Sequence, residues 1–147
     1  MNNYTGIYRN TILPVGKGES LRIPLFCDAV KAGFPSPADD YIEQALDFNE
    51  LLVKHPAATF CLRVSGNSMT GAGIHHNDIL VVDRSLSAEN NNIIIASICG
   101  ELTVKRMIKH KKEIILIPEN PEFQPVAVTE GMDFQVWGVV TNVIHKV

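Results

Sequence analysis

Residues 92–108, with the sequence NIIIASICGELTVKRMI, decide the fold class. Their two halves, Asn92–Cys99 and Glu101–Ile108, are rich in Ile, Val and Thr, and this composition favours β-strands. Cys99-Gly100-Glu101 stands between the two runs and is typical of a hairpin turn. The stretch therefore predicts two strands joined by a tight turn.

The same β-favouring composition continues on both sides of this hairpin. Turn signals occur at 118–121 (PENP) and 129–131 (TEG). Four more strands are predicted, over Thr59–Ser65, Asp78–Arg84, Glu113–Ile117 and Phe134–Ile144. The expected fold is a mainly β domain.

The first part of the chain differs in composition. Residues 1–40 contain four prolines, which fix φ and restrict the preceding residue, so this arm is predicted to be extended. Asp39 and Asp40 then offer N-caps for one short helix, with apolar residues at near-helical spacing until Pro56. The predicted organisation is an extended arm over residues 1–40 and a β-rich domain over residues 41–147.

Composition limits the classes of function. The chain has 147 residues, enough to bury roughly 68–70% of its unfolded surface as one domain without a metal or disulfide. Thirteen basic and sixteen acidic residues give a net charge of -3, which argues against direct binding to nucleic acid. The residues show neither a secretory signal nor an apolar run near the ~20 residues of a membrane span. Three dispersed cysteines, Cys27, Cys61 and Cys99, favour reduced thiols and a cytoplasmic protein.

A possible nucleophile lies in residues 64–70, VSGNSMT. A predicted strand ends at Ser65-Gly66-Asn67, and Ser68 follows directly on the turn. Such a turn exposes a hydroxyl and leaves backbone N–H groups free to face a developing oxyanion. Serine, glycine and asparagine are also common in ordinary polar turns, and this feature alone favours that alternative.

A serine nucleophile needs a base, and none of the five histidines has an obvious orienting carboxylate in the sequence. Lys105 and Arg106 lie on a predicted strand and must point to opposite faces, so one of them could face inward beside Thr103 and Met107. A lysine acts as a base if burial lowers its pKa by roughly 3 units, worth about 4 kcal/mol. Spacing alone still favours a solvated lysine on an edge strand.

The segment 74–78, IHHND, raises the question of a metal site. Adjacent histidines on a strand point apart, and no third ligand lies at a helpful offset. The segment is therefore predicted to be a polar turn before a buried strand, and neither a metal nor a cofactor is expected.

Taken together, these motifs resemble a known family. The segments 65–69 (SGNSM), 78–83 (DILVVD), 102–105 (LTVK) and 117–121 (IPENP) resemble the catalytic domain shared by LexA and UmuD proteins. Residues 31–37 (KAGFPSP) resemble the self-cleavage segment of UmuD proteins. The resemblance runs from about residue 23 to the C-terminus, in matching order and spacing.

The resemblance implies a LexA/signal-peptidase-like fold and a set of roles. Ser68 becomes the nucleophile, Lys105 the base, and Ala32–Gly33 the bond that the protein cuts in itself. Lys105 would take the Ser68 proton, and Ser68 would attack the Ala32 carbonyl to give an acyl-enzyme. Asn67 and Asn77 depart from the common family pattern, and neither is a catalytic position.

The resemblance also implies a biological setting. UmuD-like proteins of the SOS response are cut under stimulation by a RecA filament on single-stranded DNA. The shortened form dimerises and joins a UmuC-like Y-family polymerase in error-prone translesion synthesis. The long apolar run Phe134–Ile144, interpreted as an exposed edge strand, would favour a homodimer. The alternative is that both faces of this run are buried within the monomer, and the resemblance favours the homodimer.

Three alternatives remain open at this point. A LexA-like or phage-type repressor would need an N-terminal DNA-binding domain, for which residues 1–40 lack the length and charge pattern. A signal-peptidase-like enzyme would need a membrane anchor. A non-enzymatic β-rich binding module would make Ser68 and Lys105 incidental.

Overall fold

A computed structural model describes residues 18, 20–26 and 42–147 of this chain. The described residues form two compact units that divide between Lys54 and His55. The scissile bond predicted at Ala32–Gly33 lies outside the described residues. None of the helices in the described part has the length and apolar character that crossing a membrane requires.

The smaller unit is a hairpin followed by one short helix. Strand β1 (Arg22–Phe26) pairs antiparallel with β2 (Ile42–Asp47), and α1 (Phe48–Leu52) follows directly. The prediction that the helix begins after Asp39-Asp40 is wrong, because residues 42–47 are a strand. Pairing with β1, a strand distant in sequence, outweighs the preference for a helix that the spacing of the apolar residues indicates. The N-cap is Asp47, whose side chain accepts from the Asn49 N–H at 2.8 Å.

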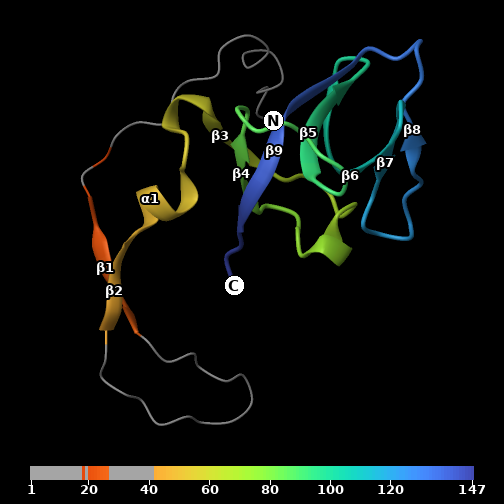
Figure 1. Cartoon of the computed structure of the whole chain (residues 1–147). Coiled ribbons are helices and arrows are strands. Elements are labelled where there is room, and N and C mark those ends of the chain that lie inside the picture. Colours follow the sequence, from red (N-terminus) through yellow and green to blue (C-terminus); the bar gives the residue numbers. More distant parts are fainter. Residues whose placement is uncertain (1–17, 19, 27–41) are drawn as a thin grey trace. The chain divides into compact units, whose positions relative to one another are not determined.

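The larger unit contains a seven-stranded antiparallel sheet (Figure 1). Its strand order is β3-β4-β9-β5-β6-β7-β8, so only the two pairs that involve β9 join strands that do not follow each other in sequence order. Short 3-10 turns at Pro56–Ala58 (η1) and Thr70–Ala72 (η2) flank the first strand. The strands are β3 (Thr59–Arg63), β4 (Ile79–Asp83), β5 (Ile93–Ile98), β6 (Glu101–His110), β7 (Glu113–Ile117), β8 (Val126–Ala127) and β9 (Phe134–Ile144).

The mainly β fold is confirmed, and all six strands predicted in this region are present. The hairpin turn between β5 and β6 is also confirmed. Cys99 and Gly100 form its two-residue loop, with φ of 50° and 86°. Positive φ at both positions matches the twist of the flanking strands, which explains the tight connection. The two-residue strand β8 was not predicted.

Strand β9 lies inside the sheet and not at its edge (Figure 1). It pairs with β4 on one side and with β5 on the other. A Cβ at Gly138 would lie 2.7 Å from Val82 Cγ1, so glycine permits the close approach of β9 to β4. The interpretation of Phe134–Ile144 as an exposed edge is therefore wrong. The predicted homodimer then depends on the family resemblance alone.

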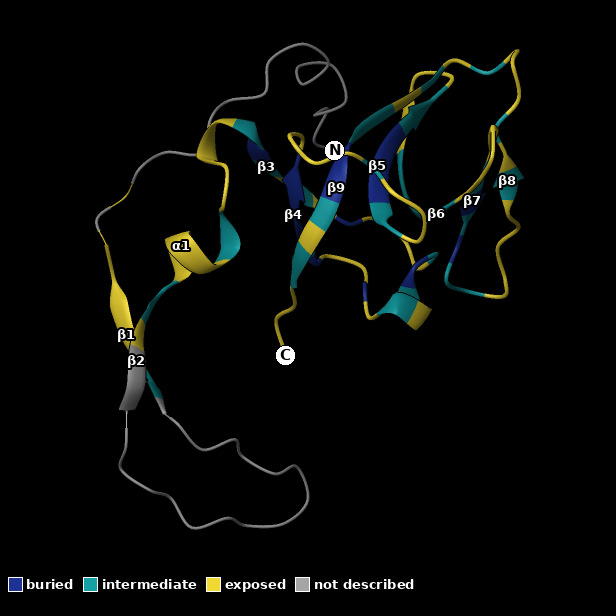
Figure 2. Ribbon diagram, viewed as in Figure 1, coloured by how far each residue is buried: buried dark blue, intermediate teal, exposed yellow. Residues whose placement is uncertain are grey.

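The core has two clusters that share strand β5 (Figure 2). Ile95 packs in the first cluster with Met69 and Leu80, while Ile94 packs in the second with Met107. Successive side chains of a strand point to opposite faces, so β5 is buried on both. The first cluster matters for the site, because Met69 directly follows Ser68 and anchors its turn to the core.

Candidate functional site

The turn that carries Ser68 follows the end of β3. Gly66 adopts a φ of 95°, a left-handed conformation that glycine adopts without strain. Met69 is only 1% exposed, and its side chain is buried in the core. The Met69 carbonyl accepts hydrogen bonds from Ala72 N at 3.0 Å and Ile74 N at 3.2 Å. Ser68 is left half-buried between a left-handed turn and an anchored methionine. Its position is therefore set by the backbone on both sides.

Residues after β7 brace this turn from outside. Asn120 Nδ2 donates to the Asn67 carbonyl at 2.8 Å, and Gly71 N donates to the Glu119 carbonyl at 2.7 Å. A Cβ on Gly71 would lie 2.6 Å from that same Glu119 oxygen, so the approach requires glycine. The 118–121 turn therefore fixes the backbone on each side of Ser68.

The structure brings Lys105 and Ser68 together. Lys105 Nζ donates to Ser68 Oγ at 3.1 Å, to Thr103 Oγ1 at 2.8 Å and to the Val104 carbonyl at 2.9 Å. Strand β6 pairs with β5 and β7, so the alternative of a lysine on an edge strand is wrong. Burial lowers the pKa of Lys105 below its ordinary value, because water is partly excluded from the charged ammonium.

The three acceptors around Lys105 suit a base. An ammonium donates three hydrogen bonds, one to each oxygen. A neutral amine keeps two N–H donors for Thr103 Oγ1 and the Val104 carbonyl, and its lone pair then faces the Ser68 hydroxyl. The arrangement needs no movement of heavy atoms to receive the serine proton.

Arg106 points away from Lys105, as the strand alternation predicts. Its guanidinium forms an ion pair with Glu119 and donates through Nη1 to the Asn91 carbonyl at 2.7 Å. Glu119 is the residue whose carbonyl accepts from Gly71 N. Arg106 therefore supports the Ser68 turn indirectly, through the 118–121 turn.

Two histidines form a side-chain hydrogen bond with a carboxylate that the sequence did not reveal as their partner. His55 Nδ1 lies 2.6 Å from Asp83 Oδ2, and His145 Nδ1 lies 2.6 Å from Asp78 Oδ1. The hydrogen bond that the structure describes at Ser68 Oγ comes from Lys105 and not from a histidine. Histidine was therefore set aside as the base for the wrong reason, since two histidines do form a hydrogen bond with a carboxylate. The residue that contacts Ser68 Oγ is nevertheless Lys105.

The 75–78 segment is a turn, as predicted, but a third potential ligand does lie beside it. One ligand atom each from His75, Asp78 and His145 falls within 4.8 Å of the others. His145 was missed because it follows β9, and the sequence alone did not reveal that β9 pairs with β4.

Comparison with known proteins identifies the family. The model of the peptidase S24-like family matches residues 24–141. The chain belongs to the peptidase S24-like family. It is 43% identical to protein ImpA of Salmonella typhimurium over 141 residues, which cover 95% of this chain and 94% of ImpA. It is 44% identical to protein MucA of Escherichia coli over 121 residues, 82% of each protein.

This S24-like chain is a UmuD-type protein, in agreement with the sequence motifs. It is also 38% identical to the LexA repressor of Bordetella avium over 116 residues, which are 79% of this chain and 54% of that repressor. The family supports a self-cleaving serine peptidase. The geometry around Ser68 and Lys105 is consistent with that activity.

Proposed function

We propose that Ser68 and Lys105 form the catalytic dyad of a self-cleaving peptidase that cuts the Ala32–Gly33 bond of its own arm. The observation that carries this proposal is the 3.1 Å contact between Lys105 Nζ and Ser68 Oγ on two separately anchored elements. A nucleophile and its base must lie within such a distance for proton transfer. The lowered pKa of Lys105 supports the same role.

The proposed reaction has two steps. Neutral Lys105 takes the Ser68 proton while Oγ attacks the Ala32 carbonyl carbon. The tetrahedral intermediate collapses, the C–N bond breaks, and the Gly33 nitrogen leaves with the proton from Lys105. The products of this step are an ester on Ser68 and a fragment that begins at Gly33. A water molecule then gives a proton to Lys105 and attacks the Ala32 carbonyl carbon. The ester bond breaks, Ser68 Oγ takes that proton from Lys105, and a free carboxyl is left on Ala32.

The brace at Asn67 suggests one group that stabilises the oxyanion. The peptide that joins Asn67 to Ser68 is planar, so fixing its carbonyl through Asn120 also fixes the direction of the Ser68 N–H. We assign the Ser68 N–H to the oxyanion, because a preorganised donor costs no reorganisation during reaction. Asn120 is then a positioning residue.

Substitution of the nucleophile tests the proposal. The Ser68→Ala chain is expected to stay intact under alkaline incubation, while the unchanged chain yields a fragment that mass spectrometry identifies as beginning at Gly33. Ser65→Ala is the matched control, because it removes an exposed hydroxyl from the same turn and leaves Ser68 in place. If the Ser68→Ala chain still releases the Gly33 fragment, Ser68 is not the nucleophile.

We also propose that a RecA filament on single-stranded DNA stimulates this cleavage, and that the shortened form acts as a homodimer with a UmuC-like Y-family polymerase. UmuD-type family membership supports this setting, and the net charge of -3 fits an indirect link to DNA. The cytoplasm remains the predicted location. Adding the filament at neutral pH is expected to raise the cleavage rate, whereas RecA without single-stranded DNA leaves it unchanged.

The predicted dimer has its own test. Sedimentation of the fragment that begins at Gly33 is expected to give twice the mass of that fragment at micromolar concentration. A monomeric mass there would contradict this part of the proposal and leave the dyad unaffected.

A further inference from the structure

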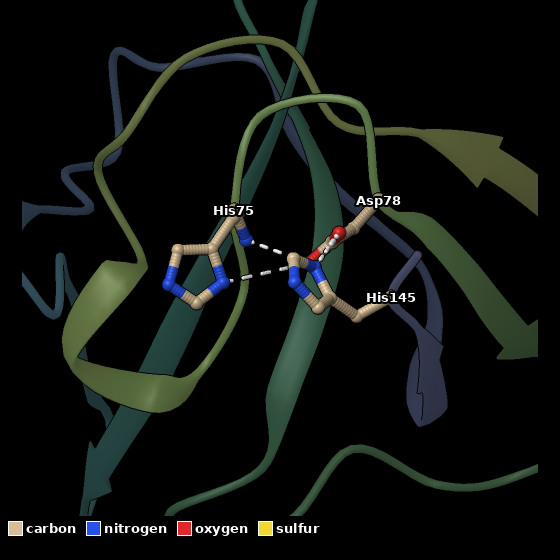
Figure 3. Close-up of side chains that lie close together, drawn as sticks. All are labelled: His75, Asp78 and His145. Carbon is tan, nitrogen blue, oxygen red and sulfur yellow. Dashed lines mark hydrogen bonds and ion pairs between the residues drawn. The ribbon is translucent and has the colours of Figure 1, made fainter. Parts of the chain in front are cut away.

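Three ionisable side chains meet where β4 begins and β9 ends (Figure 3). Asp78 directly precedes β4 and His145 directly follows β9. These strands are antiparallel, and Ile79 pairs with Ile144, so Asp78 and His145 extend the register by one position. His75 comes from the turn before β4, where its N–H donates to Asp78 Oδ2 at 2.7 Å. The pairing of two strands thus brings together residues that are 67 positions apart in the sequence.

The three side chains lie close enough together to share a metal ion. His145 Nδ1 lies 2.6 Å from Asp78 Oδ1, and His75 Nδ1 lies 3.7 Å from Asp78 Oδ2. One ligand atom from each of the three residues falls within 4.8 Å of the others. Bonds of about 2.0–2.2 Å at tetrahedral angles place ligand atoms roughly 3.3–3.6 Å apart. Binding an ion would therefore replace the His145–Asp78 hydrogen bond and require side-chain movements of about 1 Å.

Burial in the cluster suits an ion that arrives from solvent. The side chain of Asp78 is 3% exposed, whereas those of His75 and His145 are 50% and 48% exposed. An ion can therefore reach the two rings from solvent, and water has access to complete its coordination. The hydrogen bond from the His75 N–H, together with the one to His145, outweighs burial and lowers the pKa of Asp78, which favours the anion.

We propose that His75, Asp78 and His145 bind a late first-row divalent transition-metal ion such as Zn²⁺, with water in the remaining positions. Two imidazoles and one carboxylate are a ligand set typical of such ions, whereas Mg²⁺ and Ca²⁺ prefer oxygen alone. The ion would link the end of β9 to the start of β4 and stabilise the folded chain. The site includes neither Ser68 nor Lys105, so it stands or falls independently of the peptidase proposal.

Calorimetric titration of the full chain, free of any affinity tag, with Zn²⁺ at neutral pH tests the site. We expect saturable binding of one ion per chain and a thermal midpoint that rises with Zn²⁺ concentration. His145→Ala and His75→Ala are each expected to weaken binding by more than about tenfold, since each removes one of three protein ligands. Co²⁺ should give a visible absorption band that both substitutions change.

His110→Ala is the matched control, because His110 is an exposed histidine at the end of β6, outside the cluster. It is expected to leave affinity and the zinc-dependent rise in thermal midpoint unchanged. Melting each variant without metal checks that it is folded. The proposal is overturned if no one-to-one binding is seen. It is equally overturned if binding survives in both cluster variants, because the ion then binds elsewhere, for instance at Cys61 or Cys99.

Discussion

The pH dependence of self-cleavage tests the Lys105 assignment most directly. Lys105 must be neutral to accept the Ser68 proton, and the neutral fraction of an amine grows about tenfold per pH unit below its pKa. The cleavage rate should therefore rise about tenfold per unit and then level off at the pKa of the working base. Partial burial lowers the pKa of Lys105, so the plateau is expected to begin below the ordinary lysine value of about 10.4.

The measurement is the first-order rate of appearance of the Gly33 fragment between about pH 6 and 10, the range over which a buried lysine titrates. Lys105→Arg is expected to be inactive throughout, because guanidinium stays protonated. Lys109→Arg is the matched control, since Lys109 is an exposed lysine on the same strand and the same face. A rate that does not change with pH over this range would refute the mechanism.

The same lowered pKa makes a prediction about stability that does not depend on activity. When the folded pKa lies below the unfolded value of about 10.4, the unfolded chain binds more protons between these two values. The free energy of unfolding of the Ser68→Ala chain should therefore rise with pH in that window. Adding Lys105→Met should remove this rise. The effect is small, because the ammonium is only half-buried.

Three further predictions concern the arm, the brace and an ion pair. Ala32→Glu should reduce cleavage at least about 100-fold without changing the thermal midpoint, since misplacing the reacting groups by about 1 Å has that effect. Gly71→Ala should destabilise the fold by about 1–3 kcal/mol and slow cleavage, because its Cβ would lie 2.6 Å from the Glu119 carbonyl. Burial raises the pKa of Asp83, but hydrogen bonds including that from His55 outweigh it, so the net pKa falls below 3.8. Asp83→Asn should therefore cost about 2 kcal/mol in urea unfolding at pH 7, and this difference should vanish as pH falls below that lowered pKa.

Local sequence patterns predicted the strands of the larger unit well. Runs of Ile, Val and Thr carry a strand preference that survives in most contexts, and the Cys99-Gly100 turn adds a backbone preference of its own. The prediction of a helix after Asp39-Asp40 was wrong because a distant strand, and not the local pattern, decided the structure there. Residues 42–47 pair antiparallel with β1, and no pattern within the segment reveals that distant partner.

For the candidate site too, local motifs were informative and contacts between distant strands were not predicted. Ser68 and Lys105 were identified from motifs, and alternation on β6 indicated that Lys105 or its neighbour faces inward. The side chains that hold them in place depend on which strands pair, and this was not evident in the sequence. His145 illustrates the point, because it becomes a neighbour of Asp78 only when β9 pairs with β4. The same pairing explains why β9 is an inner strand and not the exposed edge that the sequence suggested.

Two adjacent residues of β6 support the Ser68 turn by separate routes. Lys105 contacts Ser68 Oγ directly, while Arg106 holds Glu119, whose carbonyl accepts from Gly71 N. The second route depends on the pairing of Arg106 with Ile117, which brings the 118–121 turn beside the strand. A slip of one residue between β6 and β7 would turn their side chains to the wrong faces and displace the brace. The Ser68 hydroxyl and the Lys105 amine therefore keep their 3.1 Å separation only while β6 and β7 hold this register, so the geometry of the proposed dyad is a property of the sheet.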